Sequence, residues 1–443
     1  MTRLKLPLGV LGAAAIALPA AAQAPEAAPP PAPVAVAALA APDFFSAAGR
    51  DTGLGADLWK GASPQTLKTV LPLVAAKPLS PAAQALARRV LATGANGPGE
   101  AGRDPALAGQ RINALIAQGG VKEAAEILSK TSGLDQSPDL SRAAAELALL
   151  SGDADRACQV GEGLATGRDD VYWVRLRAYC QVKRGEVGAA QLTFDLAQGE
   201  AKDAVYGRLM GVRLSGAGNP GAASLRNGLD VALSRDLGLD LSAAVPSPAV
   251  AAALTPKDNP EAVWPMESGP GPVRAALAAL ASGDLSTART MRASLTEADT
   301  AAAGALDLAL LDAAIAAAAG QGQEPALDRL IERGAVEGGK ARARAQAAAL
   351  SLAGLGAPMS DQALGQLAGF TAEAKASAAR LFALESAAGR PGEAALLALW
   401  IAVDAGPAGP APGDRVRVIR ALKSAGLEAD AKAFALEGLL AQR

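Results

Sequence analysis

The sequence contains no histidine and only two cysteines, and these shortages exclude several kinds of site. Without imidazole, the chain cannot form a Ser-His-Asp or Cys-His catalytic unit, a histidine-ligated metal site or a histidine pH switch. Two cysteines are too few for a cysteine-rich zinc or iron–sulfur site. We therefore predict no catalytic residue, no metal ligand and no cofactor, and we expect a protein that is not an enzyme.

The chain also lacks an excess of charge of either sign. Its 42 Lys and Arg residues oppose 44 Asp and Glu residues, which leaves a formal charge of -2. Nucleic-acid binding requires clustered basic side chains, so we predict no nucleic-acid partner. Half of the 443 residues are apolar, many of them alanine. This length suits two or three domains or one long repetitive array.

The N-terminal sequence has the pattern of an export signal. Arg3 and Lys5 form a short basic region, residues 6–18 are apolar, and an alanine-rich processing site follows. We predict cleavage after Ala22, a periplasmic location and no transmembrane anchor in the mature chain. Residues 23–42 are almost entirely Ala and Pro, a composition typical of an extended tether.

Beyond residue 100, the chain repeats a short junction in which a glycine is followed five residues later by an alanine. Successive glycines are spaced by 33, 33, 33, 65, 106 and 37 residues, which fits multiples of a unit of about 33 to 36 residues. The junctions are Gly119/Ala124, Gly152/Ala157, Gly185/Ala190, Gly218/Ala223, Gly283/Ala288, Gly389/Ala394 and Gly426/Ala431.

Each part of the junction has a physical role. Glycine takes the left-handed conformation that ends a helix, a following acidic residue favours the next helix N-terminus, and the small alanine lets two helices approach closely. In these residues the chain resembles the tetratricopeptide repeat family, over roughly residues 105–235 and 270–443. The pattern predicts an all-α solenoid of antiparallel, TPR-like helix pairs.

A proline-rich stretch interrupts the repeats. Seven prolines between residues 243 and 272 break the helical pattern and indicate a joint over 246–272. The joint would separate an N-terminal helical-repeat region at 43–245 from a C-terminal one at 273–443. Trp264 either packs the joint onto a neighbour or belongs to an exposed partner-binding segment.

The two cysteines fit one helical hairpin. Cys158 and Cys180 lie 22 residues apart, on either side of a loop predicted near residues 166–170. An antiparallel hairpin brings the two positions level, so an oxidising compartment favours a disulfide between them. A redox-catalytic pair is the alternative, although the spacing is not C-x-x-C. Two free thiols in the native exported protein would contradict the structural bond.

The same hairpin offers a candidate partner-binding surface. Tyr172, Arg175 and Tyr179 line one face of the helix predicted over residues 171–180. Repeat solenoids bind along the surface formed by one helix of each pair, and Tyr and Arg are favoured at interface hot spots. Ordinary packing with a solvated arginine remains the competing interpretation.

The remaining motifs do not indicate a specific catalytic or binding site. Residues 216–221 satisfy G-x-G-x-x-G but follow a helical pattern, so we predict an inter-helix turn there. Asp307 and Asp312 could act together only if folding supplied the right partners. The basic stretches 340–344 and 415–420 are short, which favours solvated helix faces.

Together, these features predict an exported, non-catalytic protein–protein interaction or assembly scaffold of the bacterial envelope, with envelope proteins as its partners. Two alternatives stay open. The chain also resembles the Ala-rich superhelical domains of some lytic transglycosylases, which implies an accessory protein of peptidoglycan processing in contact with the cell wall. The other alternative is a carrier that holds a small hydrophobic or glycan ligand inside a curved array.

Overall fold

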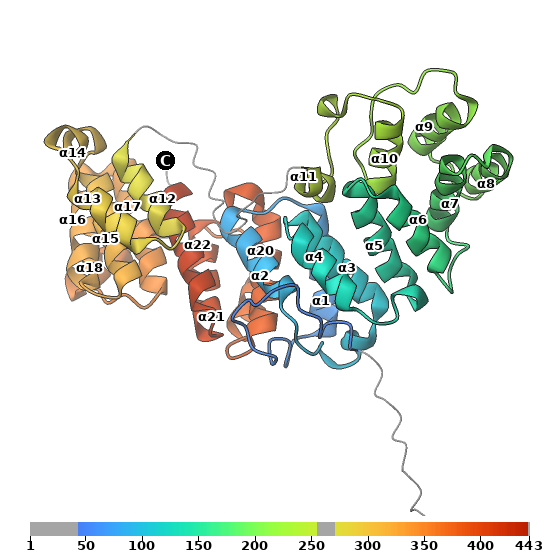
Figure 1. The fold of residues 1–443 in the computed structure, drawn as a ribbon. Helices are drawn as coiled ribbons and strands as arrows, with labels where there is room; N and C mark the ends of the chain where they lie inside the picture. Colours follow the sequence, from blue (N-terminus) through green and yellow to red (C-terminus); the bar gives the residue numbers. More distant parts are fainter. Residues whose placement is uncertain (1–42, 255–270, 442–443) are drawn as a thin grey trace, which may run out of the picture. The chain divides into compact units, whose positions relative to one another are not determined.

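The computed structural model describes residues 43–254 and 271–441, and these two ranges are all-α. They contain 22 α-helices, four short 3-10 helices and no β-strand (Figure 1). The predicted export signal and tether lie outside the described residues, as do Trp264 and most of the proline-rich joint.

Six of the seven Gly–Ala junctions join two helices that pack against each other. At these six, the glycine φ lies between 71° and 94°, a conformation that strains other residues, and the alanine is fully buried. The predicted turn, with a left-handed glycine and a closely packed alanine, is therefore present at these six places. The pairs are α3 (Pro105–Ala117) with α4 (Val121–Lys130), α5 (Pro138–Leu150) with α6 (Ala154–Gly163), α7 (Val171–Lys183) with α8 (Val187–Glu200), α12 (Pro272–Ala281) with α13 (Leu285–Ala293), α19 (Ala378–Glu385) with α20 (Pro391–Ala405), and α21 (Pro412–Ser424) with α22 (Glu428–Ala441).

The seventh junction, Gly218/Ala223, is not a tight turn between two helices. It lies in the longer loop between α9 (Ala204–Ser215) and α10 (Gly228–Asp236), and Ala223 is only partly buried. Helix α9 ends instead at Gly216, which has a φ of 65°. The G-x-G-x-x-G sequence falls in this loop, as an inter-helix turn requires.

The remaining helices complete the fold around these pairs. Helices α1 and α2 each begin at a Ser-Pro step, where proline suits the first helical position because it needs no N–H partner there. The other helices are α1 (Pro64–Ala76), α2 (Pro81–Ala92), α11 (Pro248–Leu254), α14 (Glu297–Ala303), α15 (Ala305–Ala319), α16 (Gln323–Glu337), α17 (Gly339–Gly354) and α18 (Asp361–Ala368), with 3-10 helices at Gly99–Arg103, Leu134–Gln136, Leu241–Ala243 and Gly406–Ala408.

Three main groups of buried apolar side chains form the interior. One lies among α5 to α10, and a second among α12 to α18 and the end of α22. The third contains α1 to α5 together with α19 to α22, so helices from both ends of the chain share one core. The carboxylate of Glu393 on α20 accepts hydrogen bonds from the Ser63 N–H at 2.8 Å and the Thr66 hydroxyl at 2.9 Å, at the start of α1.

The cysteine pair is brought together as the sequence predicts. Cys158 lies on α6 and Cys180 on α7, with their sulfurs at 1.99 Å and their Cα atoms at 5.7 Å. The bond ties two successive helix pairs, because α6 belongs to one pair and α7 to the next.

Several charged residues whose partners could not be predicted from the sequence form ion pairs between helices. Asp307 lies 2.7 Å from Arg344, and Asp312 lies 2.7 Å from Arg292, so each aspartate pairs with a different arginine. Arg415 is buried and lies 2.9 Å from Glu437, so the prediction that it belongs to a solvated face is wrong. Its stem contributes to the packing of α21 on α22.

Among the described residues, no helix taken singly has the length and apolar character needed to cross a membrane. The consecutive helices α14 and α15 reach that length and character only together, and a bend of 100° separates them.

Candidate functional site: a polar groove across successive helix pairs

Two cavities that share Arg142 form a polar groove across α3, α5, α7, α9 and the start of α10. The larger, of about 370 Å³, lies between α3 and α5, and the smaller, of about 120 Å³, lies among α5, α7, α9 and α10. Arg142 on α5 lines both cavities and connects them. The polar side chains that line this groove are Gln110, Asn113, Asp139, Arg142, Glu146, Asp170, Tyr172, Arg175, Asp203, Tyr206, Asn227 and Asp230.

Three arginines occupy equivalent places along this side of the molecule. Arg142, Arg175 and Arg208 are 33 residues apart, and each is the fifth residue of its helix, on α5, α7 and α9 respectively. The guanidinium of Arg142 lies 4.5 Å from the ring centre of Tyr172, and that of Arg175 lies 5.3 Å from the ring centre of Tyr206. The first two arginines therefore stack on an aromatic ring of the next first helix.

The arginines differ in how their N–H groups are used. Arg175 donates to the Ala201 carbonyl at 2.8 Å, and Arg208 donates to the Ala222 carbonyl at 2.9 Å. Each of these bonds holds the segment that leads into the following helix. Arg142 is exposed and has no hydrogen-bond or ion-pair partner among the described residues. Its N–H groups are thus open to a ligand in the groove.

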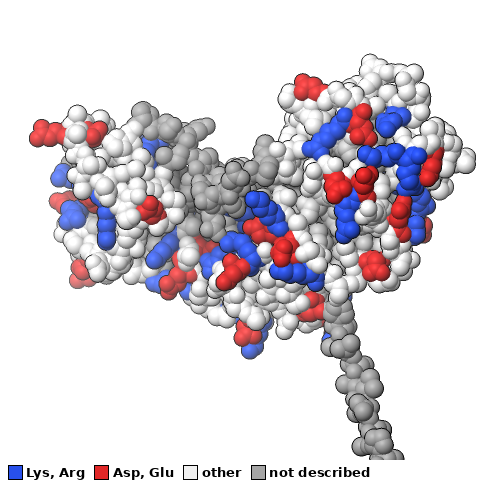
Figure 2. Space-filling view, viewed as in Figure 1, with Lys and Arg blue, Asp and Glu red and all other residues white. Residues whose placement is uncertain are grey.

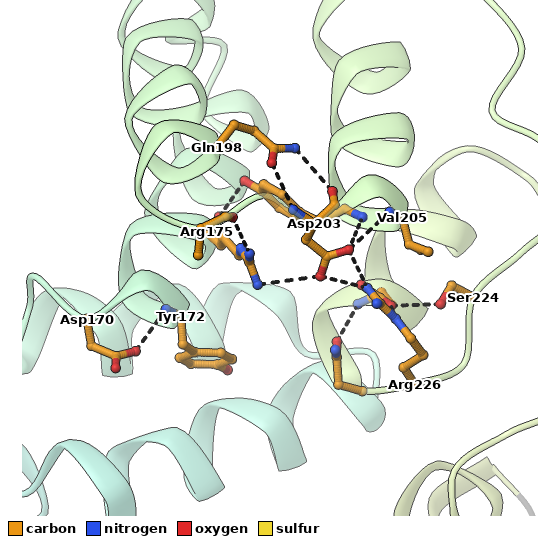
Figure 3. Close-up of polar contacts among 12 residues, drawn as sticks. Asp170, Tyr172, Arg175, Gln198, Asp203, Val205, Ser224 and Arg226 are labelled. Atoms are coloured by element: carbon orange, nitrogen blue, oxygen red, sulfur yellow. Dashed lines mark hydrogen bonds and ion pairs between the residues drawn. The ribbon is translucent and has the colours of Figure 1, made fainter.

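A network of charged groups fixes the wall beside Arg175 (Figure 3). Arg226 donates to Asp203 at 3.0 Å and to Asp230 at 2.6 Å, and Arg175 approaches Asp203 at 3.5 Å. Burial alone would raise the pKa of Asp203, but hydrogen bonds from Arg226 and the Tyr206 N–H hold it below its ordinary value. Asp203 thus remains charged and anchors the start of α9.

Glu146 lines the larger cavity, and Tyr172 lines the smaller one. Glu146 accepts a hydrogen bond from the Gly228 N–H at 2.6 Å. Burial raises the pKa of Glu146, while burial and the neighbouring Glu146 raise the pKa of Tyr172 well above its ordinary value. Tyr172 therefore stays a neutral phenol and gives Arg142 an uncharged ring to stack on.

The three residues predicted to bind a partner do not form an exposed row. Tyr172 and Tyr179 are 7% and 1% exposed, and the Arg175 side chain is mostly buried by its contacts with Ala201 and Asp203. Both tyrosines pack as the competing interpretation expects, but Arg175 is mostly covered and is not the solvated arginine of that interpretation. Burial also raises the pKa of Tyr179, next to Asp236. Only Tyr172 and Arg175 reach the groove, and they do so as parts of its wall.

Sequence reasoning did not find Arg142, although a signal for it exists. The 33-residue spacing that identifies the glycines also relates Arg142 to Arg175 and Arg208. At the equivalent position on α3 stands Gly109, where an added Cβ would lie 3.1 Å from the Asp139 side chain. This glycine lets α3 and α5 approach closely at the larger cavity.

Basic and acidic side chains are interspersed on the face shown in Figure 2. No three His, Cys, Asp or Glu residues within the described ranges are grouped so that they could hold a metal ion.

No protein-family model matches the chain, and no curated protein or solved structure matches it either. The geometry of the polar groove therefore carries the functional argument.

Proposed function

We propose that the protein is an exported, non-catalytic scaffold of the bacterial envelope that binds a partner protein along the polar groove. In this proposal the helix pairs form a TPR-like array of antiparallel hairpins, and α3, α5, α7 and α9, with the start of α10, supply the groove. The single observation that carries it is the open position of Arg142. Arg175 and Arg208 each bind a carbonyl of this chain, whereas the N–H groups of Arg142 face the groove and have no such partner among the described residues.

The lining suits an extended protein segment. Gln110 and Asn113 on α3 supply amide donors and acceptors beside Arg142, which is what the main chain of a bound peptide requires. A hydrophobic small-molecule carrier would need a mostly apolar cavity, and this groove is lined by charged and amide side chains. The lining therefore favours a partner protein over a carrier of a hydrophobic ligand.

Two features support a place in the envelope. The sequence begins with the export-signal pattern, and the Cys158–Cys180 pair is of the kind that persists in oxidising compartments. Sequencing of the mature N-terminus would test the export signal, and titration of free thiols would test the disulfide.

Photocrosslinking from the groove tests the function. A photoreactive amino acid in place of Asn113, in cells expressing the full chain, should capture a defined envelope protein. Arg142→Ala should reduce that capture strongly, because it removes the open donor. Arg156→Ala, which changes an exposed arginine on the outer helix α6, should leave the capture unchanged.

Two outcomes would contradict the proposal. One is capture that persists in Arg142→Ala, because the groove would then not be the site of contact. The other is capture of peptidoglycan fragments without any protein, which would favour the cell-wall accessory function.

A further inference from the structure

A cavity separate from the polar groove lies between α6 and α7, beside the disulfide. Its volume is about 140 Å³, and an apolar cavity of about this size can hold a benzene molecule. One side of the cavity is apolar and is formed by Cys158 on α6 and by Trp173, Leu176 and Cys180 on α7, all of them buried. None of these residues lines the groove, so the two are distinct.

Gly161 on α6 keeps this apolar side open. A Cβ added there would lie 3.4 Å from the Leu176 side chain and 3.6 Å from the Trp173 ring. A longer side chain at this position would therefore occupy part of the cavity along its apolar wall. The glycine leaves this space free, although glycine is unfavourable within a helix.

The rim of the cavity carries an excess of positive charge. Arg168, Arg177 and Arg184 line it together with one acidic residue, Glu162. Arg184 is ion-paired with both Glu162 and Glu186, so it contributes no available charge. Arg177 donates to the Arg168 carbonyl at 2.9 Å, and neither of these two side chains has an ion-pair partner among the described residues. Two arginines at the rim therefore keep N–H donors for a ligand.

Gln181 adds a polar group whose hydrogen-bonding capacity is not used. It lines the cavity, and its side-chain oxygen is buried without a hydrogen-bond partner in the described ranges. Buried polar atoms of proteins are usually satisfied, and a side-chain amide can present either its oxygen or its NH₂ group to a ligand. The cavity thus combines an apolar wall, two arginines with available donors and a buried amide.

We propose that this cavity binds a small organic anion, in which a carboxylate or a phosphate is attached to an apolar group of about the size of a benzene ring. The apolar group packs against Trp173 and Leu176, and the anionic group meets Arg168 and Arg177 at the rim. Guanidinium groups suit both anions because their parallel N–H groups bind two oxygens at once. An inorganic anion would leave the apolar wall unused, and an uncharged apolar molecule would leave both arginines unused.

Calorimetric titration of the purified protein at low ionic strength tests the inference with three matched compounds, benzoate, phenyl phosphate and the uncharged benzamide. At least one of the two anions should bind with a dissociation constant of about 0.1 to 1 mM. Benzamide should bind at least about tenfold more weakly, because it lacks the charge that the arginines attract. The tighter anion shows whether the site prefers a carboxylate or a phosphate.

Two substitutions test the two sides of the cavity. Arg177→Gln removes a charge from the rim, and Gly161→Leu fills the apolar side, so each should raise the dissociation constant of the tighter anion at least about tenfold. Arg156→Gln changes an exposed arginine of α6 that does not line the cavity, and it should leave binding unchanged. All three variants should keep the native circular dichroism spectrum.

The disulfide locates the ligand, because both of its cysteines line the cavity. A saturating concentration of the tighter anion should slow reduction by dithiothreitol at least about threefold, relative to sodium chloride at equal ionic strength, since it blocks access to the sulfurs. An unchanged rate of reduction would overturn the inference. So would the absence of anion binding up to about 10 mM, equal binding of benzamide, or binding that either Arg177→Gln or Gly161→Leu leaves intact.

Discussion

Arg111 on α3 is fully buried and shows how one residue organises the start of the fold. Its guanidinium donates to main-chain carbonyls of Phe44, Phe45, Ala47, Leu91 and Thr93, at distances of 2.8 to 3.4 Å. Burial lowers its pKa to about 10, partly offset by Asp43, so it stays charged near neutral pH. Arg111 thus binds the segment before α1 to the end of α2.

Arg111→Lys should therefore destabilise the protein. Lysine keeps the charge but cannot reach this many carbonyls, so buried acceptors lose their donors at a cost of about 3 kcal/mol. The free energy of unfolding, measured by urea denaturation, checks this. Arg103→Lys, at an exposed arginine of the same region, should change it by less than about 0.5 kcal/mol. Equal effects of the two changes would mean that the carbonyl contacts of Arg111 contribute little.

Asp430 on α22 gives stability a defined dependence on pH. It lies 2.6 Å from Arg89 on α2, yet burial outweighs this partner and raises its pKa from 3.8 to about 6. Between these two values the folded state holds a proton that the unfolded state releases. Stability from this group is therefore present at low pH and decreases as pH rises through about 6.

Asp430→Asn should remove this dependence, because the amide does not titrate. Relative to the variant, the native protein should lose roughly 2 kcal/mol of unfolding free energy between about pH 4 and pH 7. Denaturation at a series of pH values measures the difference between the two proteins, and that difference cancels the effect of other carboxylates such as Glu437. A difference that stays constant over this range would show that Arg89 holds the pKa of Asp430 near its ordinary value.

The Gly–Ala junction places two neighbouring alanines of one helix in different environments. Ala124 and Ala125 are neighbours on α4, but Ala124 is fully buried where α4 meets the preceding helix, and Ala125 is exposed. Ala124→Leu should cost about 1 to 3 kcal/mol by overpacking, and Ala125→Leu should stay within about 0.5 kcal/mol of the native protein. Thermal unfolding of both variants measures this contrast. Similar stabilities would contradict the role of the alanine in close helix approach.

The junctions could be predicted because their causes are local. A left-handed glycine and a small residue five positions later are required by the turn itself, so the sequence carries them directly. At Gly218 the pattern is present but the next helix begins later, since α10 starts with an Asn227 cap, whose side chain accepts from the Asp230 N–H at 2.9 Å. A glycine and an alanine therefore do not by themselves determine where the second helix starts.

The candidate site was harder to predict because exposure depends on neighbouring helices. Tyr179 is of a residue type that is favoured at interfaces, but the packing of α7 in the core buries it. Arg142 and Arg175 stand at the same position of their helices, so the sequence does not tell them apart. The segment entering α9 supplies a carbonyl to Arg175 but not to Arg142. Residue type and spacing locate the row of arginines, whereas tertiary contacts determine which arginine keeps its N–H groups available to a ligand.

Helices from both predicted repeat regions, at 43–245 and 273–443, contribute to one core. Helix α2 packs against α20 and α22, which follow it by about 300 residues. Glu437 accepts a hydrogen bond from the Ala82 N–H at 2.8 Å, at the start of α2. No periodic pattern in the sequence predicts such a contact, because its two partners belong to different repeats and different regions.

Coupling between the ends of the chain follows from this shared core. Phe434 is fully buried on α22, between Asp430 and Glu437, which both contact α2. Phe434→Ala should cost about 3 to 5 kcal/mol and speed amide hydrogen exchange in α2 as well as in α22. Exchange in α7, which belongs to another core, should change least, and Phe382→Ala, at an exposed position on α19, should alter none of the three. If exchange increased in α22 but not in α2, the two ends would be packed without being coupled in stability.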